Sequence, residues 1–266
     1  MNIKDTISKF IKSHLVKILY CCAILLLFIF VVIYSKNNET SEKQEDISEE
    51  IVEKENKEDF FNLKEQFNKY KEINEDYIGQ IYFESGLLNL PFVQGKTNDT
   101  YLRTDFETME YSVAGSVFMD CGNKIQEDQN IILYGHNYTP EQDPSLSKMF
   151  APLRALKEKD NYDDNKIVCL FLGDKTLKYQ IVSVYIAKIV EEDGVQYIAE
   201  DEPIYVIRNY KRDELKDYIE KFKSREYYDS GLSIEDNDKL LTLQTCVDNS
   251  VDKLIVLSKL IDVIEE

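Results

Sequence analysis

The stretch that begins at residue 241, LTLQTCVDNSVDKLIVLSKL, ends one strand-like run at Cys246 and starts a second at Lys253. A thiol at a strand end is either a small buried residue or a nucleophile. A free cysteine has a pKa of about 8.5 and is mostly protonated at neutral pH, so a nucleophilic role requires a nearby cation or base. The loop between the runs has only six residues, so we expect the second run to return beside the first.

This return would bring the ammonium group of Lys253 near the thiol of Cys246. There it could stabilise a thiolate or an oxyanion. The alternative is that Lys253 is an ordinary charge at a strand edge and Cys246 a buried filler. Spacing alone leaves both interpretations open.

The chain has two histidines, and only His136 follows a strand-like run, NIILYGH, whereas His14 precedes an apolar N-terminal segment. An imidazole can raise the thiolate fraction of a cysteine and then protonate a leaving amine. His136 is therefore the one candidate for an acid/base partner of Cys246.

The remaining cysteines offer no second nucleophile. Cys21 and Cys22 lie in the apolar N-terminal segment, and the odd number outside it predicts at least one free thiol. Cys169, within KIVCLFLG, is typical of a small buried residue, and Cys121 follows a strand-like run at a turn with nothing nearby to activate it.

No metal, nucleotide or nucleic-acid partner is expected. One histidine outside the apolar segment and no cysteine pair do not make a zinc site, and the acidic clusters lack EF-hand spacing. Nucleotide-binding glycine loops are also missing from the sequence. The formal net charge of −18 argues against nucleic acid, which requires a concentrated basic patch. The sequence thus predicts no cofactor.

The N-terminal part predicts a membrane anchor. Residues 18–34, ILYCCAILLLFIFVVIY, carry no charge and are near the lower limit for spanning a bilayer. Lysines precede this run and acidic residues follow it, so residues 1–17 are predicted to be cytoplasmic and the catalytic domain extracellular. A cleaved signal peptide is the alternative, but no small-x-small cleavage site follows the run.

An acidic linker over residues 35–58 precedes a domain over residues 59–266. Helical spacing of Phe60, Leu63, Phe67 and Tyr70 predicts an amphipathic helix. Short runs rich in Val, Ile, Tyr and Phe favour a barrel or a sandwich. The predicted strands are 113–120, 130–136, 166–173, 177–190, 239–246 and 253–261, and the predicted helices within this pattern are 145–156 and 211–224.

Together these segments resemble the sortases, and class B most closely. The resemblance covers roughly residues 75 to 262 and rests on five motifs that fall in the family's order: LPFVQGKTNDTYLRTDFE, AGSVFMD, NIILYGHNY, MFAPL and LTLQTC. It implies a mainly β fold, an eight-stranded barrel with an N-terminal helix and an extra helix, residues 211–224, before the cysteine strand. Sortases are membrane-anchored cysteine transpeptidases of Gram-positive bacteria.

The resemblance also implies roles for residues. Cys246 corresponds to the nucleophile that attacks a sorting signal of a surface protein at its Thr carbonyl to give a thioacyl enzyme, and His136 to the acid/base. An amine of a cell-wall peptide or a pilin lysine would resolve the thioacyl enzyme, and hydrolysis would be a side activity. Residues matched to the peptide groove are Asn98, Leu102, Gln244 and Thr245.

One departure concerns the third catalytic residue, which in the family is an arginine at the start of the final strand. This chain has Lys253 there and no arginine after Arg225. Arginine is a planar fork and lysine a flexible point charge, so the exchange is not conservative. Arg208 is an alternative cation, and Asp248 and Asp252 could pair with Lys253. A degenerate sortase fold that binds peptide without turnover therefore remains the alternative function.

Overall fold

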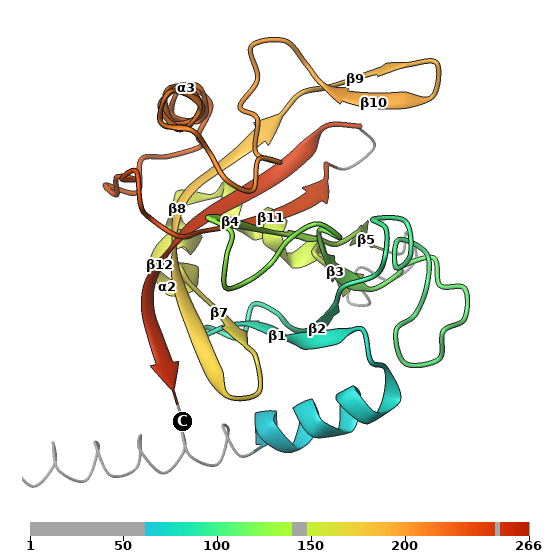
Figure 1. The fold of residues 1–266 in the computed structure, drawn as a ribbon. Helices are drawn as coiled ribbons and strands as arrows, with labels where there is room; N and C mark the ends of the chain where they lie inside the picture. The colour runs from blue at the N-terminus through green and yellow to red at the C-terminus, as the bar shows by residue number, and fades with distance from the viewer. Residues whose placement is uncertain (1–61, 140–147, 248–250, 266) are drawn as a thin grey trace, which may run out of the picture. The chain divides into compact units, whose positions relative to one another are not determined.

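A computed structural model of the chain describes residues 62–139, 148–247 and 251–265 (Figure 1). All of these residues belong to one compact unit, which begins at residue 62.

Eight strands close into a barrel in the order β1-β2-β3-β4-β11-β12-β8-β7 (Figure 1). Closure leaves no strand edge of the barrel unpaired. The predicted mainly β fold is confirmed, and of the two architectures that the strand pattern favoured, the structure is a barrel. The barrel strands are β1 (Tyr77–Phe83), β2 (Asn89–Val93), β3 (Val117–Met119), β4 (Asn130–Tyr134), β7 (Ile167–Phe171), β8 (Lys175–Ala187), β11 (Leu240–Cys246) and β12 (Lys253–Glu265).

The barrel interior is filled by aliphatic and aromatic side chains. Ile81 of β1, Leu133 of β4, Leu243 of β11 and Val256 of β12 are fully buried in one cluster. Burying this apolar surface is the main favourable term for the fold, at about 25 cal/mol per Å² of apolar area. Three strands that carry or lead to predicted site residues, β4, β11 and β12, are thus fixed in place by the packing of their interior side chains.

The first two strands of the barrel were not among the predicted strands, because each carries a residue that is unusual in a strand. Gly79 lies in β1 at a register shift, and a Cβ there would overlap the carbonyl oxygen of Phe171 in β7. The glycine therefore permits a close approach of two backbones. Pro91 lies within β2, where proline withholds one backbone donor.

The predicted amphipathic helix is observed at residues 62–73, while Phe60 lies outside the described residues. Phe67 and Tyr70 pack against a small cluster that includes Tyr77 and Phe106. This helix therefore covers one side of the barrel next to β1.

The extra helix predicted before the cysteine strand is α3 (Arg212–Lys223). A capping box starts it, with Glu214 bonded back to the backbone N–H of Lys211. Leu215, Tyr218 and Phe222 form its buried stripe, in one cluster with residues of β8. The predicted apolar face is therefore a core contact.

Two predicted elements differ from the structure. Residues 145–156 do not form an α-helix where they are described: β6 (Lys148–Met149) is followed by the 3-10 helix η2 (Ala151–Lys157), with a proline in its first turn. η3 (Lys159–Asn161) and the single-turn helix α2 (Tyr162–Asn165) continue it. β6 pairs with β5 (Asn137–Tyr138).

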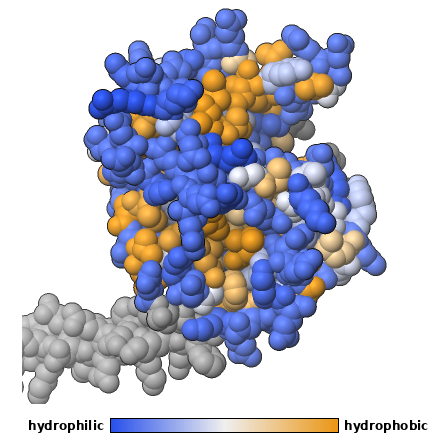
Figure 2. Space-filling view, viewed as in Figure 1, coloured by the Kyte–Doolittle hydropathy of each residue, from blue (hydrophilic) through white to orange (hydrophobic). Residues whose placement is uncertain are grey.

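The run predicted as one strand over residues 177–190 breaks after Ala187. β9 (Ile189–Glu192) and β10 (Val195–Ile198) form a separate hairpin with a turn at Asp193 and Gly194, both at positive φ. This hairpin projects from the barrel and carries exposed apolar residues, Val190 and Val195 among them (Figures 1 and 2).

The predicted single-pass membrane localisation needs correction. In the part of the chain that the structure describes, no helix is long and apolar enough to cross a membrane. A span needs about 20 apolar residues, whereas α3 has 12 residues and carries charges along its exposed side. The predicted anchor, residues 18–34, lies outside the described residues, as do residues 1–17 and the linker at residues 35–58. The described residues therefore do not support the predicted membrane anchor and extracellular localisation.

Candidate active site

Strand register brings the ends of three strands together. β11 pairs in parallel with β4, and Gln244 lies opposite Tyr134. Cys246 follows Gln244 by two residues, and His136 follows Tyr134 by two residues. Because the strands run in parallel, both side chains lie at the same end of the barrel. On its other side β11 pairs antiparallel with β12, and Cys246 lies directly opposite Lys253. The predicted return of the chain beside Cys246 is confirmed.

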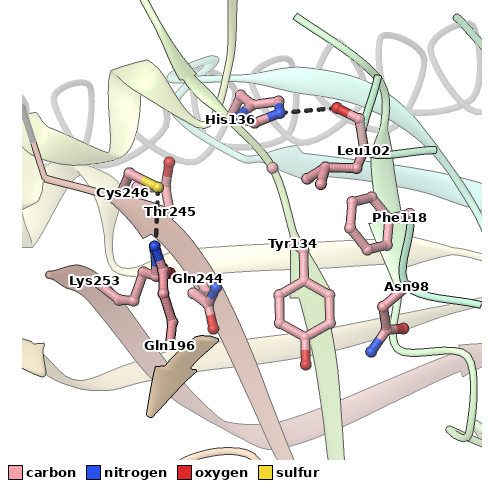
Figure 3. Close-up of a pocket in the computed structure, with 11 residues that line it drawn as sticks. Asn98, Leu102, Phe118, Tyr134, His136, Gln196, Gln244, Thr245, Cys246 and Lys253 are labelled. Atoms are coloured by element: carbon pink, nitrogen blue, oxygen red, sulfur yellow. Dashed lines mark hydrogen bonds between the residues drawn. The ribbon is translucent and has the colours of Figure 1, made fainter. Parts of the chain in front are cut away.

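All of the residues predicted for the site line one pocket of about 320 Å³ at this end of the barrel (Figure 3). Thr245 is only 3 % exposed, and its hydroxyl has no hydrogen-bond partner among the described residues. The predicted residues that line the pocket are Asn98, Leu102, His136, Gln244, Thr245, Cys246 and Lys253.

Cys246 and Lys253 form one side of the pocket. The Nζ atom of Lys253 lies 3.4 Å from the Sγ atom of Cys246 and 3.2 Å from the Oε1 atom of Gln196, which comes from β10 (Figure 3). An ammonium group has three donor hydrogens, so one remains for a third acceptor in the pocket. The side chain of Asn137 donates a hydrogen bond of 3.1 Å to the carbonyl oxygen of Cys246. This bond fixes the position of the end of β11.

His136 forms the opposite side. Its Nε2 atom lies 2.8 Å from the carbonyl oxygen of Leu102 (Figure 3). A carbonyl can only accept, so Nε2 carries the hydrogen and Nδ1 is the basic nitrogen of the neutral ring. Burial lowers the pKa of His136 below its ordinary value; the bond to Leu102 opposes this, and the charges of Arg103 and Lys253 add to it.

We expect His136 to titrate below the ordinary histidine value of 6.5. The imidazole is then neutral at neutral pH and gains its charge only as the pH falls through the lowered pKa. Lys253→Met removes one of the positive charges that oppose protonation, so it should raise the pKa of His136. NMR titration of the imidazole protons would measure both values.

Lys259→Met is the control for that titration, because Lys259 lies on the same strand and binds Asp238 and the carbonyl of Ser233 instead. It should leave the pKa of His136 unchanged. A pKa at or above 6.5 in the unmodified chain would contradict the expected direction.

The other predicted cysteines are positioned as expected. Cys169 is 2 % exposed, and burial raises the pKa of its thiol to about 11. Cys121 is exposed at the turn after β3. Neither is paired with another of the described cysteines, so all three thiols that the structure describes are free.

The alternative charges around Lys253 have other partners. Arg208 forms an ion pair with Asp120 at 3.0 Å and does not line the pocket. The carboxylate of Asp252 binds Lys188 at 3.2 Å and the backbone N–H of Ile189. Asp248 lies outside the described residues.

Three further side chains line the pocket without having been predicted: Phe118, Tyr134 and Gln196. Phe118 and Tyr134 belong to motifs that carried the resemblance, and the parallel register with Gln244 could have indicated Tyr134. Gln196 belongs to an exposed hairpin that the strand pattern did not reveal, so no sequence signal pointed to it.

Comparison with known proteins identifies the family. The chain is 31% identical to sortase B of Clostridium perfringens and matches its X-ray structure with a TM-score of 0.61, over 73% of this chain and 99% of that chain. This chain belongs to the class B sortases.

Further relatives agree with the assignment. The chain is 29% identical over 206 residues to sortase B of Staphylococcus aureus, which is 76% of this chain and 77% of that protein. The structure of a complex of S. aureus sortase B with substrate matches at 26% identity with a TM-score of 0.61, over 75% of this chain and 86% of that chain. No family model matches the sequence. As a sortase, the chain is a cysteine transpeptidase.

Proposed function

We propose that this sortase cleaves the C-terminal sorting signal of a surface protein after a threonine and transfers the acyl fragment to an amine. The acceptor is the amine of a cell-wall peptide or the lysine of a pilin. The observation that carries the proposal is the contact of 3.4 Å between Cys246 and Lys253 at the paired ends of β11 and β12. We assign the activity to a domain over residues 59–266.

In the first half-reaction, His136 takes the proton of the Cys246 thiol at its basic nitrogen, and the thiolate attacks the threonine carbonyl carbon. The carbonyl oxygen becomes an oxyanion, which the ammonium group of Lys253 stabilises. The carbon–nitrogen bond then breaks, and the protonated imidazole gives its proton to the leaving amine. The product is a thioester on Cys246.

In the second half-reaction, the acceptor amine attacks the thioester carbon. The imidazole of His136 takes the proton that the amine loses, the carbon–sulfur bond breaks, and Cys246 leaves as a thiolate, which then regains a proton from the imidazolium. Water in place of the amine would hydrolyse the thioester, which is the proposed side activity.

Four further residues are proposed to bind the peptide. Leu102 lies beside His136 and Asn98 on the same wall, while Gln244 and Thr245 precede the nucleophile on β11. Amide side chains can both donate to and accept from an extended peptide backbone, and Leu102 offers an apolar contact. The match of this chain to the S. aureus sortase B–substrate complex supports the binding of a substrate peptide.

The test uses the full chain with a panel of fluorogenic peptides that carry NPQTN-like and LPXTG-like motifs, with and without a triglycine amine. We expect cleavage after threonine for at least one motif, and, with the amine present, a transfer product identified by mass spectrometry. Products cut at another bond, or a folded chain that cleaves no peptide, would contradict the proposal.

A further inference from the structure

A half-buried carboxylate lies behind one wall of the pocket, where it binds two of the residues that line it. Asp120 follows β3, its side chain is 13 % exposed, and it is not among the residues that line the pocket. Four donors converge on it: Oδ1 accepts from the backbone N–H of Gly122 and from Arg208, and Oδ2 accepts from Asn98 and Tyr134. Burial would raise the pKa of Asp120, but these hydrogen bonds outweigh it and keep the pKa below its usual value.

Asn98, one of these donors, lines the pocket. Its Nδ2 atom donates to Asp120 at 2.9 Å, and its Oδ1 atom accepts from the backbone N–H of Cys121 at 2.8 Å. The two bonds define which end of the amide is nitrogen and which is oxygen. One N–H and one lone pair of Asn98 are then left for a ligand, in fixed directions.

Tyr134, the second donor from the pocket wall, is fixed at both ends of its side chain. The ring packs against Phe118 with centroids 5.3 Å apart, and the hydroxyl donates to Asp120 at 3.2 Å. Burial, followed by the charge of Asp120, raises the pKa of Tyr134. Because its hydrogen is committed to Asp120, the hydroxyl of Tyr134 can only accept a hydrogen bond from a ligand.

Arg208, which does not line the pocket, also binds the carboxylate, at 3.0 Å. Its guanidinium passes over Gly122, where an added Cβ would overlap the Nη1 atom. The glycine is therefore required for this ion pair to form in its present geometry, and it provides a way to move Arg208 without replacing a residue that lines the pocket.

We propose that Asp120 is a positioning residue for peptide binding: its carboxylate fixes the donor and acceptor atoms that Asn98 and Tyr134 present to the peptide. Arg208 keeps the carboxylate in place. The inference rests on the proposed function, because it takes the ligand of this wall to be the substrate peptide.

The test compares the full-length wild-type chain with Asp120→Asn on one cleavable peptide from the panel. Asparagine keeps the size of the side chain but turns one acceptor into a donor, so a bond to the pocket wall or to Arg208 is lost. We expect KM to rise by about five- to tenfold with kcat within about twofold, because the wall binds ground state and transition state alike. An unchanged KM, or a loss confined to kcat, would overturn the inference.

Asp128→Asn is the matched control. Asp128 is buried and accepts from Asn123, the backbone N–H of Lys124 and Asn209, but it contacts none of the pocket residues. We expect it to leave KM unchanged. An equal rise of KM in both variants would mean a general loss of packing and would overturn the inference.

One further variant, Gly122→Ala, keeps the test decisive if Asp120→Asn folds poorly. An added Cβ at residue 122 displaces the Arg208 guanidinium, and we expect Gly122→Ala to raise KM by about two- to threefold; no rise would count against the role given to Arg208 and Asp120. If Asp120→Asn folds, combining it with Tyr134→Phe should raise KM by less than the product of the two single effects, since both variants act on the hydrogen bonds of one carboxylate. Independent effects would contradict the shared role.

A measurement without substrate separates this inference from the proposed function. The side-chain NH₂ resonances of Asn98, assigned by their loss in Asn98→Ala, should shift in Asp120→Asn and stay in place in Asp128→Asn. Unchanged resonances in Asp120→Asn would overturn the inference. A chain that cleaves no peptide but shows these shifts would instead count against the proposed function.

Discussion

Replacing Cys246 with alanine should reduce peptide cleavage by at least about a thousandfold and abolish the covalent adduct, because the proposed nucleophile is lost. The side chain lies at the end of β11, half-buried in the pocket, and alanine leaves the backbone pairing with Lys253 intact. The fold should therefore persist, with an unchanged circular dichroism spectrum. Steady-state cleavage and intact-protein mass spectrometry would measure the loss.

Cys121→Ala is the control for this variant. Cys121 is the exposed free cysteine of the described chain, and it enters the hydrogen bonds near the pocket through its backbone only. Its replacement should leave cleavage within about twofold of wild type, as expected for a surface change. Equal activity of Cys246→Ala and wild type would rule out the proposed nucleophile.

Lys253→Met should lower kcat/KM by about a hundred- to a thousandfold, the usual cost of removing one oxyanion donor. Methionine keeps a similar length and apolar stem but has no charge, so the loss reports on the ammonium group that lies 3.4 Å from Cys246. Thermal unfolding would show whether the variant is folded. A decrease of less than about threefold would mean that the cation does not act in the transition state.

Lys253→Arg places in this chain the arginine that the family has at this position, and so tests whether lysine can replace it. A guanidinium can bind two acceptors in a fixed plane, whereas the ammonium group of Lys253 is already shared between Cys246 and Gln196. We expect Lys253→Arg to keep activity within about tenfold of wild type, because the charge is retained. A large gain would identify a compromised catalyst, and no activity in either form would favour a peptide-binding module.

The site was predictable where a short loop or a strand end determines position. Six residues separate Cys246 from Lys253, and a hairpin of that length leaves little choice but to pair the two strands. His136 was the one histidine at a strand end. What the pattern did not show was the parallel pairing of β4 with β11, which places His136 at the same end as Cys246.

The unpredicted features depend on contacts between distant segments. The hairpin of β9 and β10 follows β8, whose last residue, Ala187, lies opposite Lys253, and this pairing brings Gln196 to the ammonium group. Nothing in the spacing of Gln196 indicates such a contact. The sequence likewise indicates only that Asp120 is a turn residue after a strand. Its partner Arg208 is 88 residues away in the sequence, and only the fold places the two in contact.

The most direct test of the proposed chemistry is intact-protein mass spectrometry of the full chain mixed with a cleavable sorting-signal peptide and quenched in acid. The predicted result is one adduct with the mass of the peptide fragment that ends in threonine, mapped to Cys246 by digestion and lost on addition of hydroxylamine or an acceptor amine. A folded chain that cleaves the peptide without an adduct, or with an adduct on another residue, would contradict catalysis by Cys246.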